Sequence, residues 1–379
     1  MHASPPRWPA VFAVTVGIFA IVTLEILPIG LLTPIAAGFG VSAGTAGWTM
    51  TVPGFVAAVA APAVTVAAGR VDRRLMLSGL MVLLAAAGFL TAAAPAFGVL
   101  LAGRFLVGVV IGGFWSIGAG LAPRLVGTAA AARATSVIFA AVPLGSVLGV
   151  PLGTLVGQLA GWRTAFVLLG GLSLATAAAL VLLVPPLPPS EVTRPAVLGG
   201  LLRRRDVRSG LLVTFLVVLA HFGTYTYLTP LLRDVVRPAV LSGYLLAYGV
   251  AGIAGTFLAG RHGKGFALAA TVIALTVFAL PHTGPIGALV TLVAWGVAYG
   301  AVPVYSQAWF ARAAPDAPEA ATVLFTASFQ ATISAGALAG GFVVDAVSIP
   351  AVMTCGGVAA LLAAAVIRGV RRAPDRAFR

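Results

Sequence analysis

The chain has 379 residues, of which 60% are hydrophobic and only 8% are charged, and its mean hydropathy is +1.08. A soluble domain carries about 25% charged residues, so the composition excludes an aqueous globule and indicates an integral membrane protein. The net charge of +14 is also typical of nucleic-acid binders, but the arginines stand in short clusters between long apolar runs, which argues against a nucleic-acid partner.

Twelve apolar runs follow one another along the chain, each near the roughly 20 residues that a helix needs to cross a bilayer. The first run carries Glu25 and is too long for the apolar region of a signal peptide, so we expect it to be retained as a helix. The predicted helices cover residues 10–36, 46–68, 75–94, 97–122, 131–157, 163–184, 210–232, 239–260, 265–281, 285–310, 319–345 and 349–367.

A segment rich in proline and arginine separates the sixth run from the seventh. We therefore expect an N-terminal six-helix half over residues 1–184, a linker over 185–209 and a C-terminal six-helix half over 210–379. Short loops rich in Lys and Arg stay in the cytoplasm. With both termini and the linker cytoplasmic, nineteen basic residues fall on the cytoplasmic side and three on the opposite side. The net positive charge is therefore explained by the orientation of the helices in the membrane and does not indicate a nucleic-acid partner.

The two predicted halves repeat several local features at one spacing. Gly69-Arg70 matches Gly260-Arg261, and the Gly145/Gly149 pair matches Gly336/Gly340, each at an offset of 191 residues. Two parallel repeats around a site near the bilayer midplane are typical of transporters that rock between two orientations.

Twelve helices in two sets of six, with a basic central loop, resemble the major facilitator superfamily. The segment TVAAGRVDRRLML (65–77) resembles a weakened form of the superfamily loop G-x-x-x-D-R-x-G-R-R. Thr65 and Gly69 replace its first glycine and its aspartate, so the acidic partner of that loop is missing. The resemblance assigns a gating loop to Arg70, Asp72, Arg73 and Arg74.

Two further stretches narrow the resemblance. GRFLVGVVIGG (103–113) resembles the Arg-x-x-x-Gly pattern of proton-coupled members, and GSVLGVPLGTLVG (145–157) resembles the signature G-x-x-x-G-P-x-x-G of drug:proton antiporters, with Val150 inserted. With the Glu-x-x-Pro-x-Gly stretch at Glu25 and YTYLTPLL (225–232), the chain is most similar to the bacterial drug- and sugar-efflux branch. The resemblance implies the all-α twelve-helix fold and export, and does not identify the substrate.

The fifth predicted helix has a regular glycine spacing of its own. Glycines recur every four residues and form a stripe without Cβ atoms, against which another backbone can pack closely. A proline in this helix removes one main-chain hydrogen bond and can bend it. Small-residue packing and a hinge that lets the bundle rock are both compatible with this pattern, whose residues are Gly145, Gly149, Pro151, Gly153 and Gly157.

Glu25 and Arg104 are charged residues inside predicted membrane helices. At about 1.5 Å per residue, Glu25 lies roughly 22 Å from the cytoplasmic start of the first helix and Arg104 about 10 Å from the outer start of the fourth, so their depths nearly coincide. A charge at a helix centre costs about 2.5–3.5 kcal/mol and usually marks an ion pathway. We interpret Glu25, with Arg104 beside it, as the proton-coupling site; a static bond that locks the two helices is the alternative.

Several polar and aromatic residues fall on the helices that, by the resemblance, line the substrate cavity. His221 lies near the midplane, where it is a relay, a substrate contact or an ordinary packed histidine. Tyr225 and Tyr227 are about 200° apart on a helix, so at most one of them faces the cavity directly. The full set of predicted cavity residues is Trp115, Ser116, His221, Tyr225, Tyr227, Tyr299, Tyr305 and Gln307.

These features predict a proton-coupled antiporter that exports amphiphilic small molecules or drugs by alternating access. A sugar or metabolite exporter is the alternative within transport, and a membrane sensor or scaffold is a less favoured one because no sizeable polar segment exists. We predict no enzyme, because neither paired carboxylates nor a nucleophile–base motif occurs. Cys355 is the only cysteine, and we expect no metal and no cofactor. We expect a monomer in the bacterial cytoplasmic membrane, with protons, a small-molecule substrate and lipid as its partners.

Overall fold

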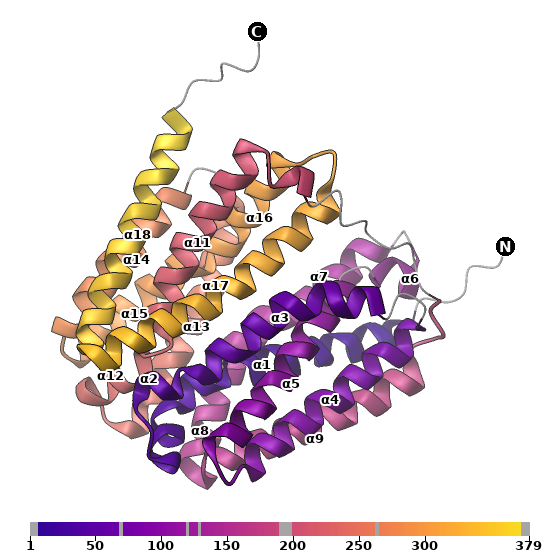
Figure 1. The fold of residues 1–379 in the computed structure, drawn as a ribbon, viewed down its shortest axis with the longest axis horizontal. Helices are drawn as coiled ribbons and strands as arrows, with labels where there is room; N and C mark the ends of the chain where they lie inside the picture. The colour runs from indigo at the N-terminus through magenta and orange to yellow at the C-terminus, as the bar shows by residue number, and fades with distance from the viewer. Residues whose placement is uncertain are drawn as a thin grey trace. The chain divides into compact units, whose positions relative to one another are not determined.

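The computed structural model describes residues 7–67, 71–118, 121–127, 130–188, 199–261 and 265–372, and within these ranges all regular structure is helical (Figure 1). Helices are expected because apolar surroundings offer the main chain no hydrogen-bond partner, so each segment must satisfy its own N–H and C=O groups. The helices are α1 (Trp8–Phe39), α2 (Ala43–Ala46), α3 (Trp48–Ala67), α4 (Arg73–Ala93), α5 (Phe97–Gly118), α6 (Ala122–Val126), α7 (Ala131–Leu144), η2 (Gly145–Gly149), α8 (Val150–Ala160), α9 (Trp162–Leu183), α11 (Arg205–Tyr225), α12 (Leu228–Val235), α13 (Pro238–Arg261), α14 (Phe266–Ala279), η3 (Leu280–His282), α15 (Pro285–Gly300), α16 (Val302–Ala313), α17 (Pro318–Ala346) and α18 (Ile349–Arg372).

Each of the twelve predicted runs is helical over most of its described length, and the seventh is interrupted between α11 and α12. The fifth run is divided into α7, the π-helical turn η2 and α8, and the tenth into α15 and α16. Helix α11 begins at Arg205, five residues before the predicted start, because a helix can continue through charged residues that hydropathy does not count. Helix α1 ends at Phe39 and is capped by Gly40, whose φ of +63° lets its N–H reach the carbonyls of Ala36 and Ala37.

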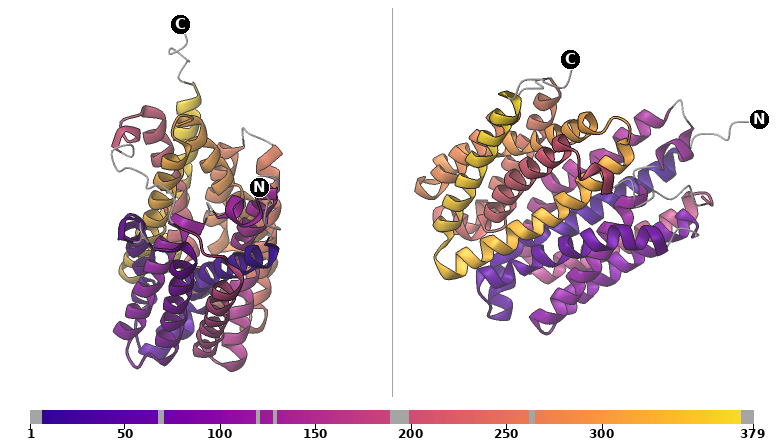
Figure 2. Two further views of the ribbon diagram at one scale, coloured as in Figure 1. Left: turned by 90° about the vertical axis from the view of Figure 1, so that its right-hand side faces the viewer. Right: turned by 45° about the horizontal axis from the view of Figure 1, so that its top comes forward.

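The chain forms two compact units. The first holds residues 1–42 and 48–192, and the second holds residues 43–47 and 193–379. Within the first unit α3 packs on α5, α4 on α9, and α1 on α7 and α9 (Figures 1 and 2). Within the second, α13 packs on α15, α11 on α17, and α14 on α18. The short helix α2 belongs to the second unit, where it packs on α17.

The glycine pairs related by 191 residues pack in equivalent ways. In the first unit Gly145 and Gly149 lie against α1, at Val22 and Thr23. In the second unit Gly336 and Gly340 both lie against the main chain of α11 at Gly223. In each unit, therefore, the fifth membrane segment approaches the first through the same pair of small residues, as internal repeats require.

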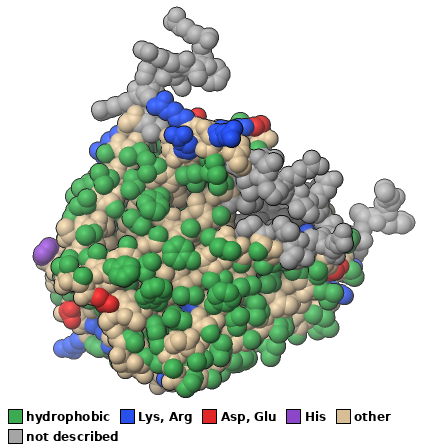
Figure 3. All heavy atoms as spheres, in the orientation of Figure 1, with side chains coloured by type: hydrophobic (Ala, Val, Ile, Leu, Met, Phe, Trp, Pro, Cys, Tyr) green, Lys and Arg blue, Asp and Glu red, His purple; other side chains and the backbone are tan. Residues whose placement is uncertain are grey.

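The surface exposes more large apolar side chains than is usual for a water-soluble protein. Leu159 and Leu182 are 79% and 81% exposed, and hydrophobic side chains are spread widely over the face shown in Figure 3. Such extensive apolar exposure marks a membrane-facing surface. Across the part of the chain that the structure describes, ten helices are long and apolar enough to cross a membrane, and Phe266–His282 is a shorter apolar helix.

Candidate functional site

Among the described residues of the first unit, Arg104 is the most deeply buried charged side chain, with 0% of its surface exposed. Its guanidinium group joins three helices through main-chain carbonyls. From α5, Nη1 donates to Leu24 O at 2.6 Å, Nη2 to Glu25 O at 2.6 Å, and Nε to Thr49 O at 2.7 Å. The first two acceptors belong to α1 and the third to α3, so one side chain holds all three helices together.

Two prolines explain why these carbonyls are available. Pro28 and Pro53 stand inside α1 and α3, four residues after Leu24 and Thr49 respectively. A proline has no N–H, so the carbonyl four residues before it loses its helical partner. A buried carbonyl without a partner costs about 1–3 kcal/mol. The guanidinium of Arg104 supplies the donors that the two prolines lack.

Glu25 lies beside this arrangement, and only 7% of its surface is exposed. A coulombic interaction links it to Arg104. The three hydrogen bonds described above go to main-chain carbonyls, including that of Glu25 itself. Because a main-chain carbonyl keeps its lone pairs whatever happens to the carboxyl group, these bonds do not depend on whether the Glu25 carboxylate is protonated.

The glycine stripe of the fifth membrane segment lies against α1. A Cβ atom on Gly149 would overlap Thr23, and one on Gly153 or Gly157 would overlap Leu27 or Leu31. The π-helical turn η2 ends at Gly149, two residues before Pro151, whose ring is buried. A π-turn next to a proline is a recognised place for a helix to bend.

The predicted gating loop is described only in part, because Arg70 lies outside the described residues. Asp72 caps α4 by accepting a hydrogen bond from the Arg74 main-chain N–H at 2.8 Å. Arg73 is buried and its main-chain N–H donates to Leu187 O at 2.9 Å, while the Arg74 guanidinium reaches Val181 O of α9 at 3.5 Å. Among these residues, the contacts join segments of the first unit.

The second unit brings three predicted cavity residues together. His221 and Tyr225 from α11 meet Tyr299 from α15, and Tyr248 of α13 and Trp295 of α15 complete a group that we call the aromatic cluster. Four of the rings are nearly parallel. Centroid separations are 3.2 Å from Tyr299 to His221, 5.0 Å from His221 to Tyr225 and 4.7 Å from Tyr225 to Tyr248. Trp295 stands nearly perpendicular to the stack.

The other predicted cavity residues lie apart from the aromatic cluster. Tyr227 is fully buried and donates its hydroxyl to Ala337 O of α17 at 2.8 Å, so it and Tyr225 point to different neighbours. Tyr305 stacks on Phe266 of α14 with centroids 5.5 Å apart. Three residues remain: Gln307 is exposed, Trp115 packs on the first unit's core, and Ser116 lies in α5 with its side chain outside the described part.

Comparison with known proteins identifies the family. Residues 11–315 match the model of the Major Facilitator Superfamily. A purine ribonucleoside efflux pump, NepI, of Escherichia coli O6:K15:H31 is 33% identical over 371 residues, covering 96% of this chain and 94% of the relative. The chain belongs to the major facilitator superfamily.

Other comparisons agree with this membership. The NepI of Salmonella enteritidis PT4 is 32% identical over 372 residues, again covering 96% of this chain and 94% of the relative. A bacterial homologue of the human lysosomal transporter Spinster, solved in an inward-facing and occupied conformation, matches with a TM-score of 0.77 at 16% identity over 98% of both chains. This major facilitator protein is therefore a multi-pass membrane transporter with the family's twelve-helix fold, and it is not an enzyme.

Sequence analysis of this major facilitator chain missed two members of the aromatic cluster. Trp295 and Tyr299 are four residues apart, as are His221 and Tyr225. Side chains at this spacing share one face of a helix. The paired spacing was therefore a signal for Trp295. Tyr248 has Tyr244 four residues before it on α13, but Tyr244 bonds Pro285 O instead of joining the cluster, so spacing alone does not identify Tyr248 and only the tertiary contact does.

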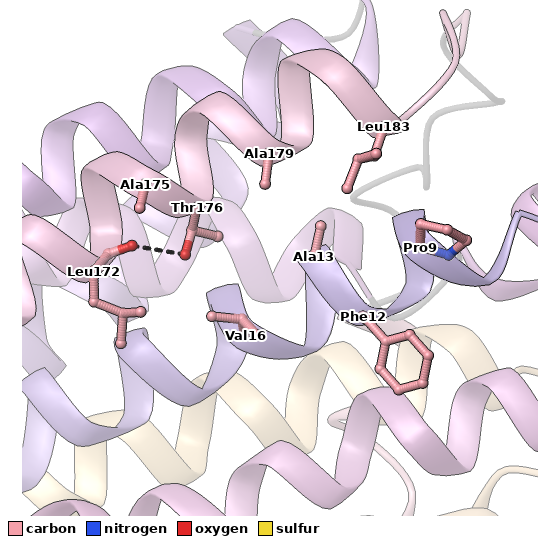
Figure 4. Close-up of a pocket in the computed structure, with 9 residues that line it drawn as sticks. All are labelled: Pro9, Phe12, Ala13, Val16, Leu172, Ala175, Thr176, Ala179 and Leu183. Carbon is pink, nitrogen blue, oxygen red and sulfur yellow. Dashed lines mark hydrogen bonds between the residues drawn. The ribbon is translucent and has the colours of Figure 1, made fainter.

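A groove of about 510 Å³ opens between α1 and α9 on the first unit of this transporter (Figure 4). The residues that line it are Pro9, Phe12, Ala13, Val16, Leu172, Ala175, Thr176, Ala179 and Leu183. The Thr176 hydroxyl donates to Leu172 O at 2.8 Å, so the lining offers a polar solute little to bind. The groove is therefore suited to an apolar hydrocarbon chain.

Proposed function

We propose that this transporter exports purine ribonucleosides or closely similar amphiphilic molecules in exchange for protons, and that it works in the bacterial cytoplasmic membrane. The proposal of proton coupling rests on the position of Glu25, which is buried beside Arg104 in the first unit. The substrate class rests on the identity of 33% to a purine ribonucleoside efflux pump over nearly the whole chain. A nucleoside combines a flat aromatic base with a polar sugar. It therefore shares features with both the amphiphilic drugs and the sugars that the sequence predicts as substrates.

The hydrogen bonds of Arg104 support coupling over a static lock. A lock that used the Glu25 carboxylate would break whenever the carboxylate took up a proton. The three bonds of Arg104 described above instead use main-chain carbonyls, so the α1–α3–α5 contact survives protonation. The helix that carries Glu25 can then stay in place while the Glu25 carboxyl group changes its charge, as a proton carrier requires. The glycine stripe and the π-turn in the fifth membrane segment support a bend as the two units rock.

The driving force depends on the charge of the substrate. One proton that crosses 100 mV releases about 2.3 kcal/mol, which supports roughly a fifty-fold gradient at 1.4 kcal/mol per tenfold. A neutral nucleoside that leaves as one proton enters moves one net positive charge inward, so the membrane potential alone drives export. A monovalent cationic drug in the same exchange moves no net charge, and only the pH gradient drives it.

Everted membrane vesicles separate these cases. A lumen-positive potential imposed with valinomycin and potassium, without a pH gradient, should drive uptake of radiolabelled adenosine and should not drive uptake of a monovalent cationic dye. Uptake of the dye alone, under a pH gradient, would favour a drug exporter. Uptake of neither would overturn the proposed substrate class.

The coupling residue is tested in the same vesicles. Glu25→Gln should abolish uphill uptake of adenosine and retain exchange of labelled for unlabelled adenosine, which needs no proton. Asp234→Asn is a matched control, because Asp234 is an exposed acid at the end of α12. Proton-driven uptake that is unchanged in Glu25→Gln would exclude Glu25 as the carrier.

A further inference from the structure

The aromatic cluster holds polar atoms that the protein leaves without partners. His221 Nδ1, Tyr248 Oη, Trp295 Nε1 and Tyr299 Oη are each buried, and none has a hydrogen-bond partner within the described residues. His221 and Trp295 are 1% and 0% exposed. A buried polar atom without a partner costs about 1–3 kcal/mol, so four in one cluster are unlike ordinary core packing.

We propose that the aromatic cluster is the site that binds the base of the exported molecule, and that this base is a purine or a similar flat bicyclic heterocycle. This inference rests on the proposed function, because it assigns the nucleoside's base to the second unit of the same transporter. The sugar then lies outside the stack. The proton carrier Glu25 belongs to the first unit, so base recognition and proton coupling are assigned to different units.

The stacked rings match the faces of such a base. Tyr299, His221, Tyr225 and Tyr248 present nearly parallel planes, with successive interplanar angles of 9°, 18° and 29°. Bases bind to aromatic side chains by stacking, and each stack makes a large, sequence-tolerant contribution to affinity. A bicyclic base that enters between two of these rings replaces the contact the rings make with each other.

The unpartnered atoms match the edges of the same base. The edge of a purine carries the acceptor N7 together with either an acceptor oxygen or a donor amine on the six-membered ring. The Trp295 indole N–H is a donor only, whereas a tyrosine hydroxyl both donates and accepts. Trp295 stands edge-on to the stack, with centroids 5.5 Å from His221 and 5.9 Å from Tyr225. The Trp295 ring, which carries this N–H, therefore lies at the side of the stacked rings, where the edge of an inserted base would be.

The rings must separate before a base can enter. The His221 and Tyr299 centroids are 3.2 Å apart, about the 3.4 Å spacing of stacked bases along one DNA strand, so nothing fits between them in this conformation. His221 is on α11 and Tyr299 on α15, so a relative shift of these two helices opens the stack. The conformation described here is therefore the closed form of the proposed base site.

Binding of tritiated adenosine to the full chain in lipid nanodiscs tests the proposal. Tyr299→Leu removes one ring and should weaken binding about 5- to 150-fold, as expected for the loss of one base–aromatic stack. Trp295→Phe keeps a ring and removes the N–H, and should weaken binding about two- to twelvefold. Uridine should compete less well than adenosine, and ribose least. Tyr244→Leu is the matched control, because Tyr244 lies on α13 one turn before Tyr248 and bonds Pro285 O instead of joining the cluster.

Photolabelling of the wild-type chain gives an answer that does not depend on how the variants fold. Irradiation with 8-azidoadenosine should place adducts on peptides of α11, α13 or α15, and excess adenosine should prevent them. Adducts confined to the first unit, or unchanged affinity in Tyr299→Leu, would overturn the base site while leaving nucleoside export intact. Absence of saturable adenosine binding to the wild type would instead refute the proposed substrate class.

Discussion

The contact between Arg104 and the two prolines makes a quantitative prediction about stability. Arg104→Leu leaves the Leu24 and Thr49 carbonyls without a donor, at about 1–3 kcal/mol each, and removes the bond to Glu25 O, at about 1.5–3 kcal/mol because its donor is charged. Against this, it removes a buried charge whose burial costs about 2.5–3.5 kcal/mol. The balance is a net loss of roughly 3 kcal/mol in the free energy of unfolding. Arg104→Lys should fall between the wild type and Arg104→Leu, because an ammonium group cannot present the guanidinium's planar fork of donors.

Restoring the missing main-chain donors should rescue this loss. Pro28→Ala returns an N–H for Leu24 O, and Pro53→Ala returns one for Thr49 O. Each change also removes proline's general helix penalty, but that contribution is the same with or without Arg104 and cancels in a double-mutant cycle. We therefore expect each proline replacement to stabilise the Arg104→Leu background by about 1–2 kcal/mol more than it stabilises the wild type.

Unfolding in mixed micelles of increasing dodecyl sulfate content, followed by tryptophan fluorescence, measures these energies. The chain has six tryptophans to report on it. Thiol-reactive dyes are unsuitable, because Cys355 is already exposed in the folded state. Arg312→Leu, which removes an exposed arginine at the end of α16, should change the free energy little. A coupling energy of zero between Arg104 and both prolines would refute the explanation given for these bonds.

Three further predictions address the hinge, the contact between α2 and Asp345, and the surface ion pair. Gly149→Ala should lower the free energy of unfolding by about 1–3 kcal/mol and slow export, because its Cβ meets α1. Asp345→Ala should speed amide exchange at Gly44 at least tenfold, because the Asp345 carboxylate accepts that N–H at 2.9 Å and a bond to a charged group is worth about 1.5–3 kcal/mol. Asp316→Asn should leave the pH profile of export between pH 5.5 and 8 unchanged. The bidentate hydrogen bond from Arg204, at 2.6 Å, lowers the pKa of Asp316 to about 2 from 3.8, so its stabilising contribution is complete above 3.8 and is lost only as the pH falls toward 2.

Each of these has its own control. Gly171→Ala adds a Cβ where nothing lies within 4 Å and should be neutral or slightly stabilising, so equal losses at both glycines would contradict close packing as the cause. Unchanged exchange at Gly44 would mean that Asp345 does not hold α2. A pH profile that shifts in Asp316→Asn would assign the titration to the ion pair and weaken the case for Glu25.

Much of the fold was predictable because the signals for it are local. Length, apolar runs and the distribution of arginines depend on the chain's own order, and each of the twelve predicted runs coincides with helix. The resemblance to the major facilitator superfamily is confirmed by comparison with known proteins. Helix ends were less accurate, as at Arg205, because charged residues extend a helix past its apolar span.

Side-chain partners were much less predictable. Charge and depth singled out Glu25 and Arg104, yet the bonds of Arg104 to main-chain carbonyls follow from the registers of three helices that only packing sets. Pro28 and Pro53 already indicate from the sequence that the carbonyls of Leu24 and Thr49 lack a helical donor. Their spacing does not indicate which side chain supplies a donor instead. Likewise the i, i+4 spacing of Trp295 and Tyr299 is visible in one dimension, whereas their meeting with Tyr248 depends on how α13 lies against α15. The sequence by itself determined the solvent and the helices, because hydrophobicity and backbone hydrogen bonding act along the chain. The tertiary structure alone decided which polar groups meet, because contacts between distant segments depend on helix rotation and depth that no single segment contains.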